Sequence, residues 1–281
     1  MPVKKRPRGR YHDLVTSLHT NSPAPIRGLP RILGVSGSTP DNVADGVPGF
    51  AEDEHETKFA FDERILPRVL GTLRARCQPD GKYAIGQVRS IYYDTHRWQA
   101  VDEKLNSDFL KTKIRLRHYG ALPGGAPVGN AFLEAKFKLG SCRRKLRVQT
   151  DWTAQDVREM DLSGPELKRV PELLLQDVCG FHGEPPGPLL PVFEVTYHRF
   201  RFVEPRSGAR LSIDTQIRVS RVNRSRLPAP RKLPLGRAVL EVKGEHQALP
   251  QSLADLNRLG CKREAFSKFG VCFNWLRYAS H

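Results

Sequence analysis

The chain runs Lys111-Thr-Lys-Ile-Arg-Leu-Arg-His-Tyr119 near its middle, and its side chains alternate between two kinds. Lysine, arginine and tyrosine hold the odd positions, whereas threonine, isoleucine, leucine and histidine hold the even ones. Because successive side chains of a β-strand point to opposite faces, this run predicts a strand with one cationic face and one largely apolar face. An ordinary antiparallel sheet with its polar face in water is the alternative interpretation.

Neighbouring stretches repeat the alternation. Glu134, Lys136 and Lys138 alternate with apolar residues, and residues 209–220 do the same. Ten basic residues and a single acidic one lie between positions 111 and 147. Like charges opposite one another destabilise a sheet, so we expect an anion to neutralise this face. Acidic residues on the same faces would supply oxygen ligands for a hard divalent cation; they are Glu54, Glu56, Glu134, Asp214 and Glu241.

Periodicity places the remaining elements. We expect strands at 53–61, 86–94, 110–119, 131–139, 143–151, 191–203, 209–219 and 237–244. We expect helices at 63–76, 153–160, 165–178, 250–259 and 264–277. About eight strands are enough to close a barrel with a lumen. The predicted fold is therefore α+β: an eight-stranded antiparallel closed β-barrel, basic inside and apolar outside, with packing helices.

Composition limits the partners and the compartment. The 46 Lys and Arg against 30 Asp and Glu give a net charge of +16, so the partner is expected to be anionic. No apolar run approaches the roughly 20 residues needed to span a bilayer, which argues against an integral membrane protein. Five scattered cysteines without a CxxC pair argue against a disulfide scaffold and a cysteine-rich zinc site, and they fit a cytoplasmic location.

The chain divides into two parts near position 50. Residues 1–50 are basic and rich in Pro, Gly and Ser, which predicts a disordered tail. Such a tail could contact nucleic acid or an acidic membrane surface peripherally. Residues 51–281 carry the alternating pattern and form the predicted folded domain.

Several segments resemble a known family. Glu54-His-Glu-Thr-Lys58 is similar to the E-x-E-x-K signature of triphosphate tunnel metalloenzymes, the CYTH-like superfamily. More specific segments, in the family's order, resemble its polyphosphate polymerase branch, the VTC (vacuolar transporter chaperone) domain. They are Ser90–Thr95, Lys113–Gly120, Phe132–Lys138, Phe193–Arg199, Arg210–Thr215, Ala238–Gly244 and Phe266–Gly270.

The resemblance implies an eight-stranded tunnel and a metal-dependent polyphosphate polymerase that transfers the terminal phosphoryl group of ATP to a growing polyphosphate chain. It implies Mn²⁺ or Mg²⁺ as cofactor, with Glu241 and Glu56 as metal ligands. The catalytic residues it implies are Lys58, Arg115, Arg117, Lys136, Tyr197, Arg199, Arg210 and Lys268. The substrate-binding residues it implies are Lys138, Lys145, Lys243 and Ser267.

Other functions remain open on the sequence. Glu54 makes the first motif similar to the hydrolytic tunnel enzymes, so a triphosphate or tripolyphosphate hydrolase is one alternative. A non-catalytic polyphosphate-binding module is another. A nucleic-acid binder is disfavoured, because the basic residues alternate with apolar ones instead of forming an exposed stripe with stacking aromatics. Ala265 stands where the family leads us to expect a basic residue, and Lys262 or Arg263 would compensate.

The paired arginines give one expectation about stability. Arg115 and Arg117 would repel each other in an empty tunnel. We therefore expect Arg115→Ala and Arg117→Ala to melt no lower than the unaltered protein when no ligand is bound. The sequence indicates no oligomeric state.

Overall fold

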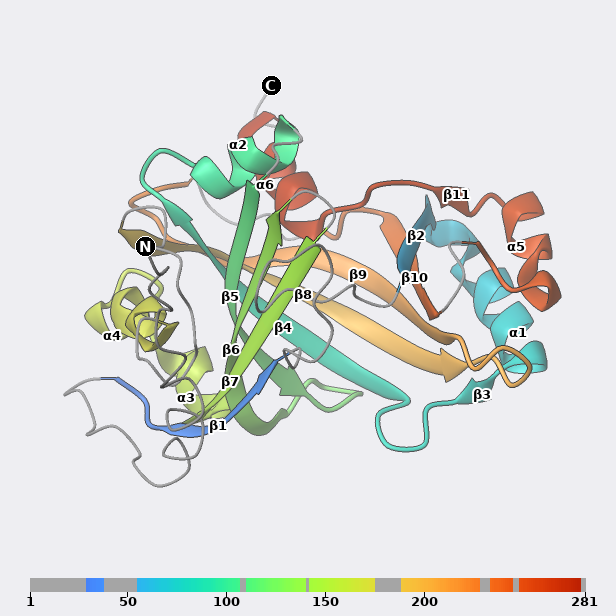
Figure 1. Ribbon diagram of the computed structural model, residues 1–281, viewed down its shortest axis with the longest axis horizontal. Helices are drawn as coiled ribbons and strands as arrows, with labels where there is room; N and C mark the ends of the chain where they lie inside the picture. Colours follow the sequence, from blue (N-terminus) through green and yellow to red (C-terminus); the bar gives the residue numbers. More distant parts are fainter. Residues whose placement is uncertain are drawn as a thin grey trace, which may run out of the picture.

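The computed structural model describes residues 29–37, 55–106, 110–139, 142–174, 188–227, 233–244 and 248–278. A single antiparallel sheet of 11 strands forms its frame (Figure 1). The strands are β1 (Ile32–Gly37), β2 (His55–Asp62), β3 (Gln78–Pro79), β4 (Ile85–Thr95), β5 (Leu110–Gly120), β6 (Pro127–Leu139), β7 (Cys142–Thr153), β8 (Leu189–Val203), β9 (Arg210–Val222), β10 (Arg237–Gly244) and β11 (Lys262–Arg263). Their order is β1-β7-β6-β5-β4-β8-β9-β10-β2-β11, with β3 paired to β8.

All the strands expected from alternation are present, as β2 and β4 to β10. The strands missed by the sequence analysis are short. β3 and β11 have two residues each. β1 lies within the stretch 1–50, for which no strand was predicted, and it pairs with β7. The rest of that stretch, apart from residues 29–31, lies outside the described residues.

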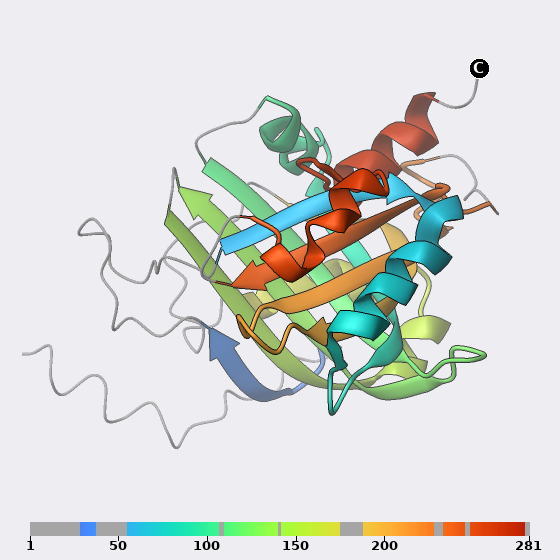
Figure 2. The same ribbon diagram turned by 90° about the vertical axis from the view of Figure 1, so that its right-hand side faces the viewer.

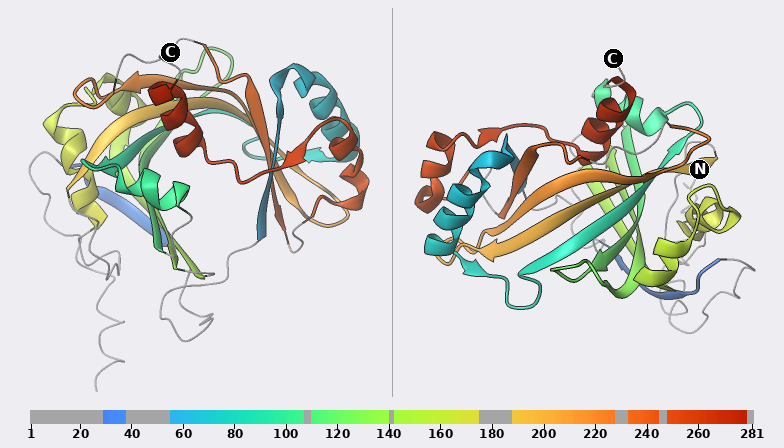
Figure 3. Two further views of the ribbon diagram at one scale, coloured as in Figure 1. Left: turned by 90° about the horizontal axis from the view of Figure 1, so that it is seen from above. Right: turned by 180° about the vertical axis from the view of Figure 1, so that it is seen from behind.

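The prediction of a closed eight-stranded barrel is wrong. The sheet is strongly curved, but its strand order is an open path (Figure 3). A closed barrel would need β7 and β2 to pair with each other. In the described chain the free edge of β7 is taken by β1, and the free edge of β2 is taken by β11. The added edge strands therefore leave a curved, open sheet in place of a tunnel.

The helices are short and lie in three groups. They are η1 (Glu63–Ile65), α1 (Leu66–Arg76), α2 (Gln99–Leu105), α3 (Ala154–Glu159), α4 (Pro165–Arg169), η2 (Val170–Leu174), η4 (Gln251–Leu253), α5 (Asp255–Arg258) and α6 (Lys268–Tyr278). Helices were predicted at all these places except α2. That helix follows Trp98, which has a positive φ of 63°, and the buried Asp94 carboxylate accepts hydrogen bonds from Ala100 and Val101 in its first turn.

Each helix group covers its own apolar cluster. Val157 and Leu167 of α3 and α4 pack on one face of β4 to β7. α1 and α5 cover β2 and β8 to β10 at the other end of the sheet (Figure 2). α2 and α6 pack on Tyr92, Phe193 and neighbouring residues. Leu116 and Leu133 are fully buried, so the apolar side of the alternating strands is the covered side, as predicted.

Candidate functional site

The cationic side of the sheet lines a cavity of about 660 Å³. Its walls come from β2, β4 to β8, β10, β11, the segment 264–267 and the start of α6. All but two of the predicted site residues line it: Glu56, Lys58, Arg115, Arg117, Lys136, Lys145, Tyr197, Arg199, Glu241, Lys243, Ser267 and Lys268. Alternation along separate strands therefore brings together side chains that are far apart in the sequence.

The other two predicted residues are Arg210 and Lys138. Arg210 is exposed at the start of β9, opposite Lys243 in the register, and it does not line the cavity. Lys138 lies on β6, but its side chain is outside the described residues. Arg263 lines the cavity beside Ala265, so the basic residue missing at 265 has a substitute close by.

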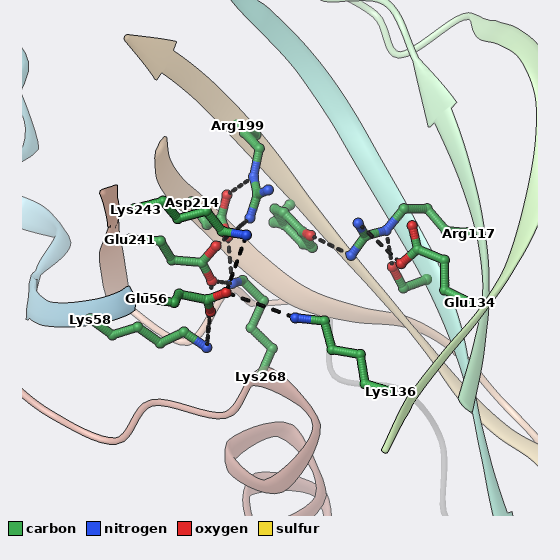
Figure 4. Close-up of polar contacts among 12 residues, drawn as sticks. Glu56, Lys58, Arg117, Glu134, Lys136, Arg199, Asp214, Glu241, Lys243 and Lys268 are labelled. Carbon is green, nitrogen blue, oxygen red and sulfur yellow. Dashed lines mark hydrogen bonds and ion pairs between the residues drawn. The ribbon is translucent and has the colours of Figure 1, made fainter. Parts of the chain in front are cut away.

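Glu134 organises the arginines at one end of the cavity. It is the direct register partner of both Arg115 and Arg147 on the neighbouring strands. Its Oε2 atom lies 2.6 Å from Nη2 of Arg115. The same atom lies 3.4 Å from Nη1 of Arg117 (Figure 4). Burial by itself would raise the pKa of Glu134, but Arg117 and Arg115 outweigh it and hold the pKa well below its usual value. Glu134 is therefore a buried anion behind a cationic wall.

The second acidic point lies across the cavity and consists of two carboxylates, Asp214 and Glu241. Asp214 accepts from Nε and Nη2 of Arg199 at 2.5 and 2.6 Å, and it also pairs with Lys268. Glu241 contacts the same two cations, at 2.9 Å from Arg199 Nη2 and 3.0 Å from Lys268 Nζ. Burial would raise the pKa of Glu241, yet Lys268 and Arg199 lower it well below its usual value.

Glu56 forms the third acidic point. Lys58 and Lys243 approach its carboxylate at 3.0 and 3.4 Å, and Lys136 approaches at 3.8 Å. Burial opposes its charge, but Lys58 and the other lysines bring the pKa of Glu56 to about 2. Lys136 is crowded by other cations and partly desolvated, and burial is the main reason that its pKa falls to about 8.

Glu56 and Glu241 suit a hard divalent cation. Lys58 Nζ lies 3.0 Å from one carboxylate and 3.8 Å from the other, so the two face the same point. Among the described residues, no group of three or more His, Cys, Asp or Glu side chains is arranged to hold a metal. Mg²⁺ is commonly held by one or two carboxylates, with phosphate and water oxygens completing its shell. The carboxylates of Glu56 and Glu241 therefore fit a metal ion whose other ligands are phosphate and water oxygens.

Two buried acids have surroundings that differ from those expected from the sequence. Glu134 and Asp214 were expected to supply oxygen ligands for a cation, but the structure surrounds them with Arg and Lys side chains. Their register opposite Arg115 and Arg199 was the signal that could have revealed this, and it requires knowing which strands are neighbours. Lys113, which donates to Ser267 Oγ at 3.1 Å, is a further cavity cation that was not assigned.

Comparison with known proteins identifies the family. Residues 53–277 match the VTC domain, so the chain belongs to the VTC-domain family. No curated protein matches the chain. This membership confirms the resemblance given by the sequence segments, and it supports a function in phosphoryl transfer or polyphosphate chemistry.

Two solved structures share a distant likeness. A candidate adenylate cyclase from Bacillus halodurans is 13% identical, with a TM-score of 0.44, over 78% of this chain and 95% of that one. A candidate adenylate cyclase from Vibrio parahaemolyticus is 10% identical, with a TM-score of 0.39, over 76% and 95%. At this level of similarity neither structure informs the function of the chain.

No helix in the described residues is long and apolar enough to cross a membrane.

Proposed function

We propose that this member of the VTC-domain family is a metal-dependent polyphosphate polymerase that uses ATP. The observation that carries the proposal is the single cavity in which Arg115, Arg117, Arg199 and Lys268 converge from two strands and a helix. A surface of this kind suits a chain of phosphates, because planar guanidinium groups bind phosphate oxygens bidentately.

The proposed reaction exchanges one phosphorus–oxygen bond for another. The bond between the β,γ-bridging oxygen and the terminal phosphorus of ATP breaks, and ADP leaves with the bonding electrons. A new bond forms between that phosphorus and a terminal oxygen of polyphosphate. Phosphoryl transfer needs little covalent help from a protein, and it depends on holding the groups in line and neutralising their charge.

The described side chains meet these needs in different ways. Arg199 and Lys268 are fixed by buried carboxylates and face the cavity, so they would bind phosphate without first having to be ordered. Tyr197 is buried beneath them, with Lys268 Nζ 5.0 Å from its ring centre, and it limits the positions that Lys268 can adopt. Glu241 and Glu56 would hold Mn²⁺ or Mg²⁺, which when bound would neutralise charge on the phosphates.

Product analysis tests the proposal directly. Purified protein incubated with ATP and Mn²⁺ should form long-chain polyphosphate, visible on a gel, together with ADP. The triphosphate hydrolase alternative rests on Glu54, the first acid of the E-x-E-x-K motif, which lies outside the described residues; the second acid of the motif, Glu56, lines the cavity. A hydrolase would release orthophosphate from triphosphate and make no polymer. Binding of triphosphate without either product would identify a non-catalytic module.

A further inference from the structure

Asp214 lies behind the wall of the cavity. Its side chain has 0% exposure, and it is absent from the residues that line the cavity. The cations that it holds, Arg199 and Lys268, do line the cavity. Its place is set by the sheet, because Asp214 of β9 is the register partner of Arg199 on β8 and of Val239 on β10.

Asp214 and Glu241 share the same two cations. Arg199 Nη2 donates to both carboxylates, at 2.6 Å to Asp214 and 2.9 Å to Glu241. Lys268 Nζ likewise pairs with both. Glu241 lines the cavity, whereas Asp214 does not. A divalent cation that binds Glu241 therefore competes with Arg199 and Lys268 for the same carboxylate oxygens, and those two side chains then need another counter-charge.

We propose that Asp214 is a positioning residue for the metal site: it retains Arg199 and Lys268 from behind, so that the Glu241 carboxylate is released to a divalent cation. The inference rests on the proposed function, in which Glu241 is the metal ligand. It gives Asp214 a role that is distinct from binding phosphate or metal itself.

Asp214→Asn should move two binding reactions in opposite directions. The substitution keeps the side-chain volume and one acceptor oxygen for Arg199, but it removes the negative charge. In the described contacts, Glu241 then becomes the sole carboxylate paired with Arg199 and Lys268, and the cavity gains one positive charge. Both changes weaken the binding of Mn²⁺. Triphosphate binding should not weaken, because the added positive charge favours the anion and the amide oxygen of the new side chain still accepts a hydrogen bond from Arg199.

The experiment measures the two ligands separately on the full chain. Free Mn²⁺ is followed by electron paramagnetic resonance during titration with the metal alone. Inorganic triphosphate is followed by thermal shift in the presence of a chelator. For Asp214→Asn we expect the Mn²⁺ dissociation constant to rise roughly tenfold, the scale of one added charge near a divalent ion. The triphosphate shift should equal or exceed that of the unaltered protein.

Glu194→Gln is the matched control. Glu194 is also 0% exposed and ion-paired, with Arg89 and Arg221, but neither of these arginines lines the cavity. The Glu194→Gln variant should have a lower melting temperature than the unaltered protein, with unchanged affinities for Mn²⁺ and triphosphate. A parallel loss of both affinities in Asp214→Asn, or an unchanged Mn²⁺ affinity, would overturn the proposal.

A double variant keeps the test available if Asp214→Asn does not fold. Asp214→Asn with Lys268→Met removes a buried pair together, which proteins often tolerate. Because a competing cation is now gone and the net charge of the site is restored, Mn²⁺ affinity should return to within about threefold of the unaltered protein. A loss of tenfold or more in this charge-balanced variant would refute the role of Asp214. If the unaltered protein binds neither ligand, the proposed function itself fails.

Discussion

Glu134 reverses one expectation drawn from the sequence. Arg115 and Arg117 were expected to repel each other, so that losing either guanidinium would not lower stability. The structure places a buried carboxylate, 3% exposed, between them and Arg147. Removing Arg115 leaves the buried Glu134 carboxylate with fewer compensating cations, which costs stability. This cost is larger than the stability gained when the repulsion between Arg115 and Arg117 is lost.

We now predict that Arg115→Ala destabilises the ligand-free protein by about 2 kcal/mol, less than for a fully isolated charge because Arg117 and Arg147 remain. The thermal shift given by triphosphate should also become smaller, because one phosphate-binding group is lost. Differential scanning calorimetry with and without triphosphate measures both effects. Arg115→Met combined with Glu134→Gln should recover part of the stability but not the triphosphate shift. An unchanged melting temperature for Arg115→Ala would contradict this account.

Glu241 is the residue on which metal dependence is predicted to rest. Glu241→Gln removes charge but little volume, and Asp214 and Glu56 still pair with its former cation partners, so the fold should survive. Turnover that depends on metal should be lost, because an amide is a poorer ligand for a hard cation. Activity assays over a range of Mn²⁺ concentrations, with circular dichroism as the folding control, make the test. Unchanged activity at saturating Mn²⁺ would assign the metal to another carboxylate.

At the scale of elements, α6 positions Lys268. The next residue, Phe269, stacks on Tyr92 and Phe193 with ring centres 5.0 and 5.3 Å apart. We predict that Phe269→Ala costs about 3–5 kcal/mol and also weakens triphosphate binding, because the start of α6 shifts. Leu167→Ala in α4, which packs in a separate cluster, should cost a similar amount without changing triphosphate affinity. Equal ligand shifts in the two variants would show that α6 does not position the site.

The covered face beneath α3 holds a pH-sensitive pair. His118 Nε2 lies 2.9 Å from Glu194 Oε1, both side chains are fully buried, and His118 Nδ1 has no hydrogen-bond partner in the part of the chain that the structure describes. Arg89 and Arg221 also face Glu194, and the latter donates to the backbone carbonyls of Val157 and Met160 around the end of α3. Burial lowers the pKa of His118 despite the opposing effect of Glu194. The neutral ring is thus the folded form.

The sign of the stability change follows from that pKa. The unfolded chain takes up a proton on His118 near the ordinary pKa of about 6.5, whereas the folded chain does so only at lower pH. Stability from this group is therefore present above pH 6.5 and is lost as the pH falls below it. Between pH 7.5 and 5.5, the melting temperature of the unaltered protein should fall a few degrees more than that of His118→Gln. Parallel curves would refute the assignment.

Elements were largely predictable because alternation is local. Residues 111–119 indicate both the strand β5 and its two faces without reference to any other part of the chain. α2 could not be found in the same way, because it depends on Asp94 accepting from backbone amides and on the rare backbone conformation of Trp98. The roles of Glu134 and Asp214 depend on strand register, which a single sequence does not display.

At the scale of the whole molecule, closure of the sheet was the property that the sequence could not decide. Strand number allows a barrel, but closure depends on which strands meet at the two edges. β1 and β11 are short, and neither was predicted, yet they occupy the edges that a barrel would join. Most of the predicted site residues still line one cavity, with Arg210 as an exception, because a curved sheet gathers the side chains of its concave face whether or not it closes.

The open sheet leads to a prediction about how polyphosphate enters the cavity. A closed tunnel admits a polymer only by threading an end, whereas an open trough admits a chain from the side. Polyphosphate with both ends attached to bulky groups should therefore compete with triphosphate in a binding assay, to within about threefold of an unblocked chain of equal length, since the contacts are the same. Failure of the blocked chain to compete would indicate that ligand must enter by an end.

During synthesis, β2 is made long before β10, the strand with which it pairs. Lys58 on β2 pairs directly with Glu241 on β10, and Lys268 follows later still. A nascent chain that has emerged only as far as β9 thus carries Glu56 and Lys58 on a strand with no partner on either edge. Such an edge readily pairs with other chains. Ribosome pausing between β9 and β10 would therefore prolong the period in which β2 is most prone to aggregate. Bound phosphate could not yet stabilise the site, because the helix that supplies Lys268 has not been made.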